Sequence, residues 1–145
     1  MDLSFLTLLL VLALAFANGT NDVSKAIATL VGSGATNYRT AILWGTIWTI
    51  VGAGTSTFIA SAMVTTFSHG LVQTGTSLQP AVTLAVLIGA MAWVLFASRT
   101  GLPVSTTHAL TGAIVGTGMV AFAGEGLIWP VIGTKIALPL LLSPF

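Results

Sequence analysis

Apolar runs alternate with short polar segments along the whole chain. Ala41 to Val64 is long enough to cross the hydrocarbon core of a bilayer as one helix, Ala81 to Ala97 nearly so, and Leu3 to Ala17 predicts a first helix. Shorter apolar runs cover Ala26 to Val31 and Ala109 to Ala123, and a last run begins at Leu127. The pattern predicts several helices at membrane depth.

The composition agrees with this pattern. Of the 145 residues, 55% are hydrophobic and only 5% are charged, and the mean hydropathy is +1.04. A soluble domain carries about 25% charged residues because its surface faces water. We therefore expect an all-α integral membrane protein, with residues 1–145 forming a single transmembrane domain. The net charge of +1 gives no field for nucleic acid, and the absence of Cys excludes disulfides and thiolate metal sites.

Two arginines suggest how the chain is oriented in the membrane. Arg39 and Arg99 flank the two longest apolar runs at the ends away from the segment Thr65 to Pro80, which has no Lys, Arg, Asp or Glu. Short cytoplasmic loops collect Lys and Arg. We expect a multi-pass protein of the cell membrane with both arginines inside and residues 65–80 outside.

Two polar islands interrupt the apolar pattern. The first polar island is Asn18 to Lys25, and the second is Arg99 to His108. Each contains a glycine that permits a sharp turn and residues that cap helices well, and Pro103 disfavours helix at the residue before it. Each island therefore predicts a break, followed by the start of a half-helix.

Broken helices at membrane depth are tolerated where they are buried in protein or line a cavity. Their N-termini present free N–H groups and the positive end of a dipole, which suit an anion. The hydroxyls of Ser105, Thr106 and Thr107 add donors, while Asp22 and the amide oxygen of Asn21 suit a small cation such as sodium. An anion site beside a cation site is the arrangement found in coupled transporters.

Simpler roles fit several of these residues. Asn21, Ser105 and Thr106 each fit a capping role alone, and His108 fits a neutral histidine bonded to a carbonyl as well as a charge partner for the site. Asp22 and Lys25 are harder to assign to structure alone, because an ionisable residue within a membrane segment costs about 2.5–3.5 kcal/mol on insertion scales. Their i,i+3 spacing allows an ion pair.

Small residues at four-residue spacing predict close packing of helices. Gly112 and Gly116 form a GxxxG pair, and Gly45, Thr49 and Ala53 repeat the spacing in another run. In lipid, such spacing lets two helix backbones approach closely.

Both islands resemble the motifs of one transporter family. Gly19-Thr20-Asn21-Asp22-Val23 resembles the GANDVxN signature of the inorganic phosphate transporter (PiT) family. Gly101-Leu102-Pro103-Val104-Ser105-Thr106-Thr107-His108 is similar to that family's G-x-P-V-S-T-T-H element, and Gly112 and Gly116 continue it. The resemblance extends from about Leu12 to Pro144.

The resemblance implies secondary transport of inorganic phosphate, a symport driven by sodium or protons, with no other cofactor. It also implies a fold of two inverted repeats with the substrate site where the repeats meet. Asn21 would then serve both phosphate and the coupling ion, and Asp22 the coupling ion. Ser105, Thr106 and Thr107 would bind phosphate.

The sequence departs from the family pattern in three ways. Lys25 stands where the family has its second Asn, and a fixed ammonium beside Asp22 would compete with sodium, which favours proton coupling or an altered substrate. Thr20 replaces an Ala. Only one copy of each motif is present, so we expect a fragment or one repeat, truncated near residues 127–145. The alternative is a half-sized protein that pairs with a second chain, as in a homodimer.

Other functions compete with phosphate symport. A sulfate or other oxyanion permease would use the same donors, and a passive anion channel would use the helix ends without needing Asp22. An intramembrane hydrolase would use Ser105 with His108, but their spacing is that of cap residues and no nucleophile motif surrounds Ser105. We therefore expect a transporter and not an enzyme.

Overall fold

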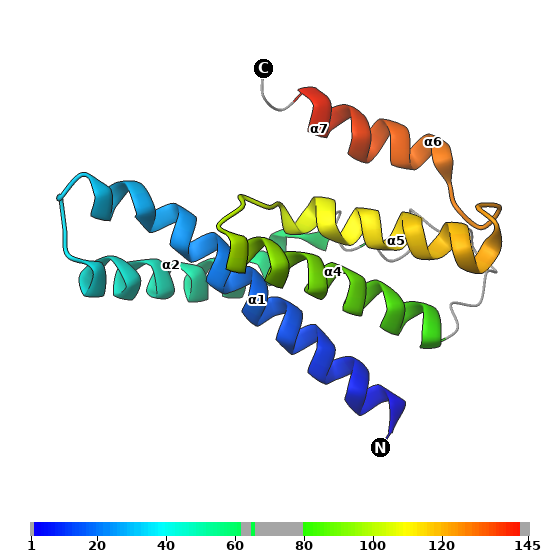
Figure 1. Cartoon of the computed structure of the whole chain (residues 1–145), viewed down its shortest axis with the longest axis horizontal. Helices are drawn as coiled ribbons and strands as arrows, with labels where there is room; N and C mark the ends of the chain where they lie inside the picture. The colour runs from blue at the N-terminus through cyan, green and yellow to red at the C-terminus, as the bar shows by residue number, and fades with distance from the viewer. Residues whose placement is uncertain (1, 62–64, 66–79, 143–145) are drawn as a thin grey trace.

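Three long helices dominate the chain. The computed structural model describes residues 2–61, 65 and 80–142, and every regular element in these ranges is a helix. Helix α1 covers Leu3–Gly32, α2 covers Tyr38–Ile59 and α4 covers Pro80–Thr100 (Figure 1). Each is long and apolar enough to cross a membrane. The prediction of an all-α integral membrane protein is confirmed.

Shorter helices complete the described chain. Helix α5 covers Thr106–Phe122 and follows α4 after a short linker. Beyond a turn, α6 (Trp129–Val131), a π-helical segment η2 (Ile132–Ala137) and α7 (Leu138–Leu142) follow one another directly (Figure 1). The turn returns onto α5, since a Cβ added to Gly118 would lie 2.7 Å from Leu127 Cδ2. Gly118 is therefore needed for this close approach.

Helix α1 is longer than the other helices and contains the first polar island. Its 30 residues extend about 45 Å at 1.5 Å per residue, which exceeds the ~30 Å hydrocarbon core. Apolar residues precede the island from Leu3 and follow it to Val31. The island therefore lies in the second half of one uninterrupted helix.

The core forms where three helices meet. Helix α1 packs against α2 and α4, and α4 packs against α5. Ala17 of α1, Val94 of α4 and Ala109 of α5 make a buried cluster. Two of the three side chains are single methyl groups, so the backbones can approach closely, as in membrane helix packing generally. Ala17 directly precedes the first polar island, so this packing holds the island against α4 and α5.

The predicted small-residue packing is found at one of the two places. A Cβ added to Gly45 would lie 3.0 Å from Val23 Cγ1 and 3.2 Å from Ile27 Cγ2, so α2 approaches α1 closely there. Added Cβ atoms at Gly112 and Gly116 would have no neighbour within 4 Å among the described residues. The predicted packing at this GxxxG pair is therefore not seen in the described part of the chain.

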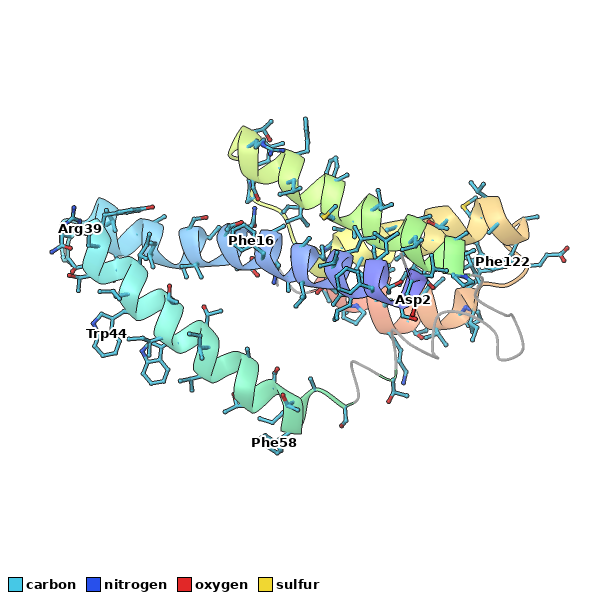
Figure 2. All side chains as sticks on the ribbon, turned by 90° about the horizontal axis from the view of Figure 1, so that it is seen from below. Asp2, Phe16, Arg39, Trp44, Phe58 and Phe122 are labelled. Carbon is cyan, nitrogen blue, oxygen red and sulfur yellow. The ribbon has the colours of Figure 1, made fainter. Side chains whose placement is uncertain are left out.

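Helix α2 exposes a wide apolar face. Trp44 and Phe58 point away from the other helices (Figure 2) and are 55% and 86% exposed, and the rings of Trp44 and Trp48 stack with centroids 6.4 Å apart. Such a face suits contact with lipid.

The helix directions agree with the placement of the two arginines on one side. Helix α2 begins and α4 ends toward the left of Figure 1, so Arg39 and Arg99 lie at ends that point the same way. Residues 66–79 of the predicted outer loop, and Ala62 to Val64 of the predicted long run, lie outside the described residues. Which side faces the cytoplasm stays a prediction.

Candidate functional site

The second polar island breaks the helix as predicted. Helix α4 ends at Thr100, and Gly101 has a φ of 71°, in the left-handed region that glycine adopts without strain. Ser105 has extended backbone, and its Oγ accepts a hydrogen bond from the backbone N–H of His108 at 3.4 Å. Ser105 is therefore the N-cap of α5, and the first backbone N–H groups of that helix lack partners within it.

The first polar island does not break the helix, and the predicted half-helix start there is wrong. Helix α1 continues through Asn18 to Lys25, so Asn21 is not an N-cap. The hydroxyls of Thr20 and Ser24 donate to the helix's own carbonyl oxygens, of Ala17 and Asn21, both at 2.8 Å. A glycine alone costs a helix only about 1 kcal/mol, and the island has no proline, so tertiary packing keeps the helix intact.

An uninterrupted helix arranges the island's side chains in a stripe. The stripe consists of Asn18, Asn21, Asp22 and Lys25. Their spacings of three, four and seven residues place these side chains on one face of the helix. This face meets α4 and the linker before α5. Thr20 and Ser24 lie on another side, where α1 and α2 line an open apolar cavity of about 770 Å³. The cavity therefore receives none of the four stripe residues.

Direct contacts join the two islands. The hydroxyl of Thr106 donates to Asn18 Oδ1, and the ammonium of Lys25 donates to the Val104 carbonyl oxygen at 2.5 Å. Asn21 Nδ2 donates to Ser98 Oγ at 2.9 Å, one residue before the second island begins. Three side chains of α1 thus contact the end of α4, the linker and the start of α5.

Asn21 has the most notable environment in the stripe. It is 4% exposed, and its Oδ1 has no hydrogen-bond partner among the described residues. Ser98 Oγ cannot relieve this atom, because Asn21 Nδ2 already donates to it and it donates to the Val94 carbonyl at 2.8 Å. Leaving a buried acceptor unsatisfied costs about 1–3 kcal/mol. A donor or a cation from elsewhere would satisfy it.

Asp22 and Lys25 form the predicted ion pair. Lys25 Nζ lies 3.4 Å from Asp22 Oδ1. The side chain of Lys25 is 37% exposed and that of Asp22 is 55% exposed. The pair is therefore partly open in this chain, not fully buried. Lys25 also contacts the linker, so one ammonium is shared by both islands.

The other predicted residues gather at the start of α5. Thr107 is half-buried, and its carbonyl oxygen accepts from the Thr111 hydroxyl at 2.7 Å. His108 is exposed and contacts Ser105 Oγ through its backbone N–H, so this contact does not involve its imidazole ring. Of the two predicted charge partners for the site, Lys25 and His108, the structure places Lys25 beside Asp22.

The atoms that could bind a metal ion between the islands are carboxylate, amide, hydroxyl and backbone oxygens. The described part of the chain has no group of three or more His, Cys, Asp or Glu side chains that could hold a metal ion. A sodium ion would have to take Asp22 together with amide and backbone oxygens. Sequence reasoning missed Asn18 and Ser98 as site residues. Asn18 could have been found from its spacing of three and seven residues to Asn21 and Lys25 on one helical face.

Comparison with known proteins gives one consistent result. A family model described as the phosphate transporter family matches residues 18–145. A protein named as a phosphate permease from Pyrococcus abyssi is 37% identical over 143 residues, covering 96% of this chain. Proteins named as low-affinity inorganic phosphate transporters from Mycobacterium leprae and Streptomyces halstedii are each 33% identical, covering 98% and 99% of this chain. No solved structure matches.

The relatives are longer than this chain. The chain spans 34% of the length of the Pyrococcus abyssi and Mycobacterium leprae proteins and 66% of the Streptomyces halstedii protein. The names of the relatives describe transporters and permeases, as expected for a family without enzymatic activity.

Proposed function

Because this chain belongs to the phosphate transporter family, we propose that it forms part of a secondary transporter that carries inorganic phosphate across the cell membrane together with a cation. The observation that carries the proposal is the meeting of the two polar islands. Asn18, Asn21 and Lys25 of α1 contact the segment from the end of α4 to the start of α5. The residues of two distant motifs thereby share one location.

The start of α5 supplies the features that an anion requires. Its first N–H groups and the positive end of its dipole point toward the linker, and the hydroxyls of Ser105, Thr106 and Thr107 lie in the same turn. Phosphate at neutral pH is an anion with several acceptor oxygens, so these donors would bind it without a full positive charge. In this proposal all three residues bind phosphate, and the Thr106 hydroxyl exchanges its hydrogen bond to Asn18 Oδ1 for one to phosphate.

Asn21 would distinguish phosphate from other oxyanions. Its buried Oδ1 accepts no hydrogen bond from the described residues, so a ligand that brings its own hydrogen would satisfy it. Hydrogen phosphate carries such a hydrogen, whereas sulfate at neutral pH does not. A sulfate permease is therefore disfavoured by this one atom.

Asp22 would provide the coupling. A carboxylate in the second half of a membrane-spanning helix, beside an anion site, suits either a bound sodium ion or a transported proton. A passive channel would need neither, so the carboxylate favours symport.

The complete site would need a second part. The chain spans 34% of two of its relatives, and the apolar faces of α1 and α2 are largely open. A second, inverted repeat or a second copy of the chain would cover these faces and complete a multi-pass transporter. The 27 large apolar residues exposed in the described chain would in part meet this second unit and in part meet lipid.

The proposal is tested by phosphate binding and uptake. The protein is purified with any chains that accompany it and reconstituted in liposomes, and uptake of radioactive phosphate is measured under sodium and pH gradients. Loss of one hydrogen bond to a charged ligand costs about 1.5–3 kcal/mol, so Ser105→Ala and Thr106→Ala should each weaken phosphate binding roughly tenfold or more.

Thr117→Ala is the matched control, because it removes a hydroxyl from α5 far from its N-terminus. Unchanged phosphate affinity in both Ser105→Ala and Thr106→Ala would remove the second island from the site. Equal competition by sulfate would indicate an oxyanion permease, and uptake that never exceeds the external concentration would indicate a channel.

A further inference from the structure

Lys25 places a positive charge between the two polar islands. Its Nζ lies 2.5 Å from the Val104 carbonyl oxygen and 3.4 Å from Asp22 Oδ1. Val104 lies in the non-helical linker that precedes the cap of α5, so its carbonyl oxygen is not part of a helix. One ammonium therefore joins a carboxylate of α1 to a backbone oxygen that lies 79 residues after Lys25.

This pair of oxygens is suited to a small cation. Carboxylates and backbone carbonyls of non-helical segments are the ligands that hard cations prefer, and unwound backbone carbonyls coordinate sodium in several transporters. In this chain the position between them is filled by the chain's own ammonium. A lysine ammonium carries the same charge as a sodium ion but cannot leave.

A free cation would bind poorly beside this ammonium. Two like charges about 4 Å apart, at an effective dielectric constant of about 20, repel enough to weaken binding on the order of a thousandfold. Asp22 is already paired, and Arg99 and His108, which belong to the neighbouring island, add no negative charge to attract sodium.

We propose that Lys25 is a tethered cation that takes the place of a sodium ion between Asp22 and the Val104 carbonyl, so that sodium does not bind between the islands. Uptake of phosphate is then independent of the sodium gradient. The uptake part rests on the proposed phosphate function, whereas the absence of sodium binding does not.

A purely mechanical role for Lys25 makes a different prediction. If Lys25 only pins the linker to α1, any long side chain that donates a hydrogen bond to Val104 would serve equally well, whatever its charge. Lys25→Gln keeps a donor and removes the charge, and Lys25→Arg keeps both. The two variants therefore separate the charge from the contact. Lys135, the other lysine of the chain, lies in η2 outside both islands, so Lys135→Gln is the matched control.

The experiment measures thermal unfolding of the purified full assembly in detergent, in sodium chloride and in potassium chloride at equal ionic strength. The wild type, Lys25→Arg and Lys135→Gln should show no sodium-specific change. Lys25→Gln should gain a sodium-specific rise in unfolding midpoint on the order of 5 °C when sodium is about a hundredfold above its dissociation constant. This pattern supports the proposal.

Two outcomes overturn it: a sodium-specific rise in the wild type that equals the rise in Lys25→Gln, or no rise in a folded Lys25→Gln. If Lys25→Gln does not fold, wild-type phosphate uptake decides. Equal rates under sodium and potassium gradients support the proposal, and a tenfold acceleration by sodium overturns it. Failure of the wild type to bind inorganic phosphate would instead sink the proposed function, while the sodium-dependent midpoints would remain interpretable.

Discussion

The two polar islands have similar residues but different backbones. Both contain a glycine, at least one threonine and side chains that cap helices, yet α1 continues through the first while α4 ends in the second. The second island has Pro103, and its Gly101 adopts a positive φ of 71°. The first has no proline, and its hydroxyls bond to carbonyls of their own helix. Cap residues therefore permit a break, but proline and a left-handed glycine enforce it.

The difference determines what each island offers. The second island releases backbone N–H groups at the start of α5. The first keeps its backbone bonded and offers only side chains, arranged on one face by the helical repeat. A site that combines them has donors from the backbone on one side and amide, carboxylate and ammonium groups on the other.

The largest expected effect comes from placing proline in each island. Thr20→Pro removes an α1 backbone hydrogen bond and clashes with the preceding turn, which should lower the free energy of unfolding by about 3 kcal/mol or more. Thr106→Pro falls at the first position of α5, where a helix accepts proline. The preceding residue, Ser105, has a φ of −97° and a ψ of 123°, which suit the residue before a proline. It should lose only the hydroxyl bond to Asn18, about 1 kcal/mol.

Both free energies are measured by unfolding in mixed micelles with increasing SDS, followed by fluorescence of the chain's 4 tryptophans. Equal losses for the two prolines would mean that the backbone difference between the islands does not exist in the folded protein.

The two glycines should respond to alanine with opposite signs. Gly101→Ala places a side chain at a φ of 71°, which costs about 1–2 kcal/mol. Gly19 lies within α1, and an added Cβ there meets nothing within 4 Å, so Gly19→Ala should stabilise by about 0.5–1 kcal/mol. The same SDS titration measures both. Destabilisation by Gly19→Ala would show that α1 bends or opens at this position in the complete assembly.

The sequence predicted the features that depend on local chemistry. The spanning helices α2 and α4 follow from apolar length, the break in the second island from Gly101 and Pro103, and the Asp22–Lys25 pair from its spacing. The continuity of α1 was not predictable, because Asn21 and its neighbours fit a cap as well as a helix face. The partners of Asn18 and Asn21 lie 88 and 77 residues away, and they depend on how the helices are rotated against one another, which no local pattern specifies.

The two serines give a smaller contrast. Ser105 caps α5, so Ser105→Ala should cost about 1 kcal/mol. Ser24 donates to the Asn21 carbonyl within α1, and alanine is the better helix former, so Ser24→Ala should be neutral or stabilise by about 0.5 kcal/mol. Unfolding in SDS measures both. A loss at Ser24 as large as that at Ser105 would mean that Ser24 has a tertiary partner from a second unit.

The smallest effect concerns the contact through which α1 is attached to α4. Asn21→Ala removes the bond to Ser98 Oγ but also removes the unsatisfied Oδ1, so the single variant mixes a loss with a gain. A double-mutant cycle with Ser98→Ala separates them, since only the shared bond appears in the coupling energy. Hydrogen bonds between membrane helices contribute about 0.6 kcal/mol on average and up to about 1.7, and we expect a coupling in this range.

The control cycle pairs Asn21→Ala with Thr117→Ala, which lies on α5 about 16 Å beyond Thr106 at 1.5 Å per residue. In this control cycle, the changes in unfolding free energy caused by the two substitutions should add to within about 0.3–0.5 kcal/mol. A coupling between Asn21 and Ser98 no larger than this would mean that the first island is held against α4 by the packing of Ala17 and Val94 alone. The Asn21 amide would then be free to turn its N–H groups toward an anion, and its role would be that of a donor instead of an acceptor.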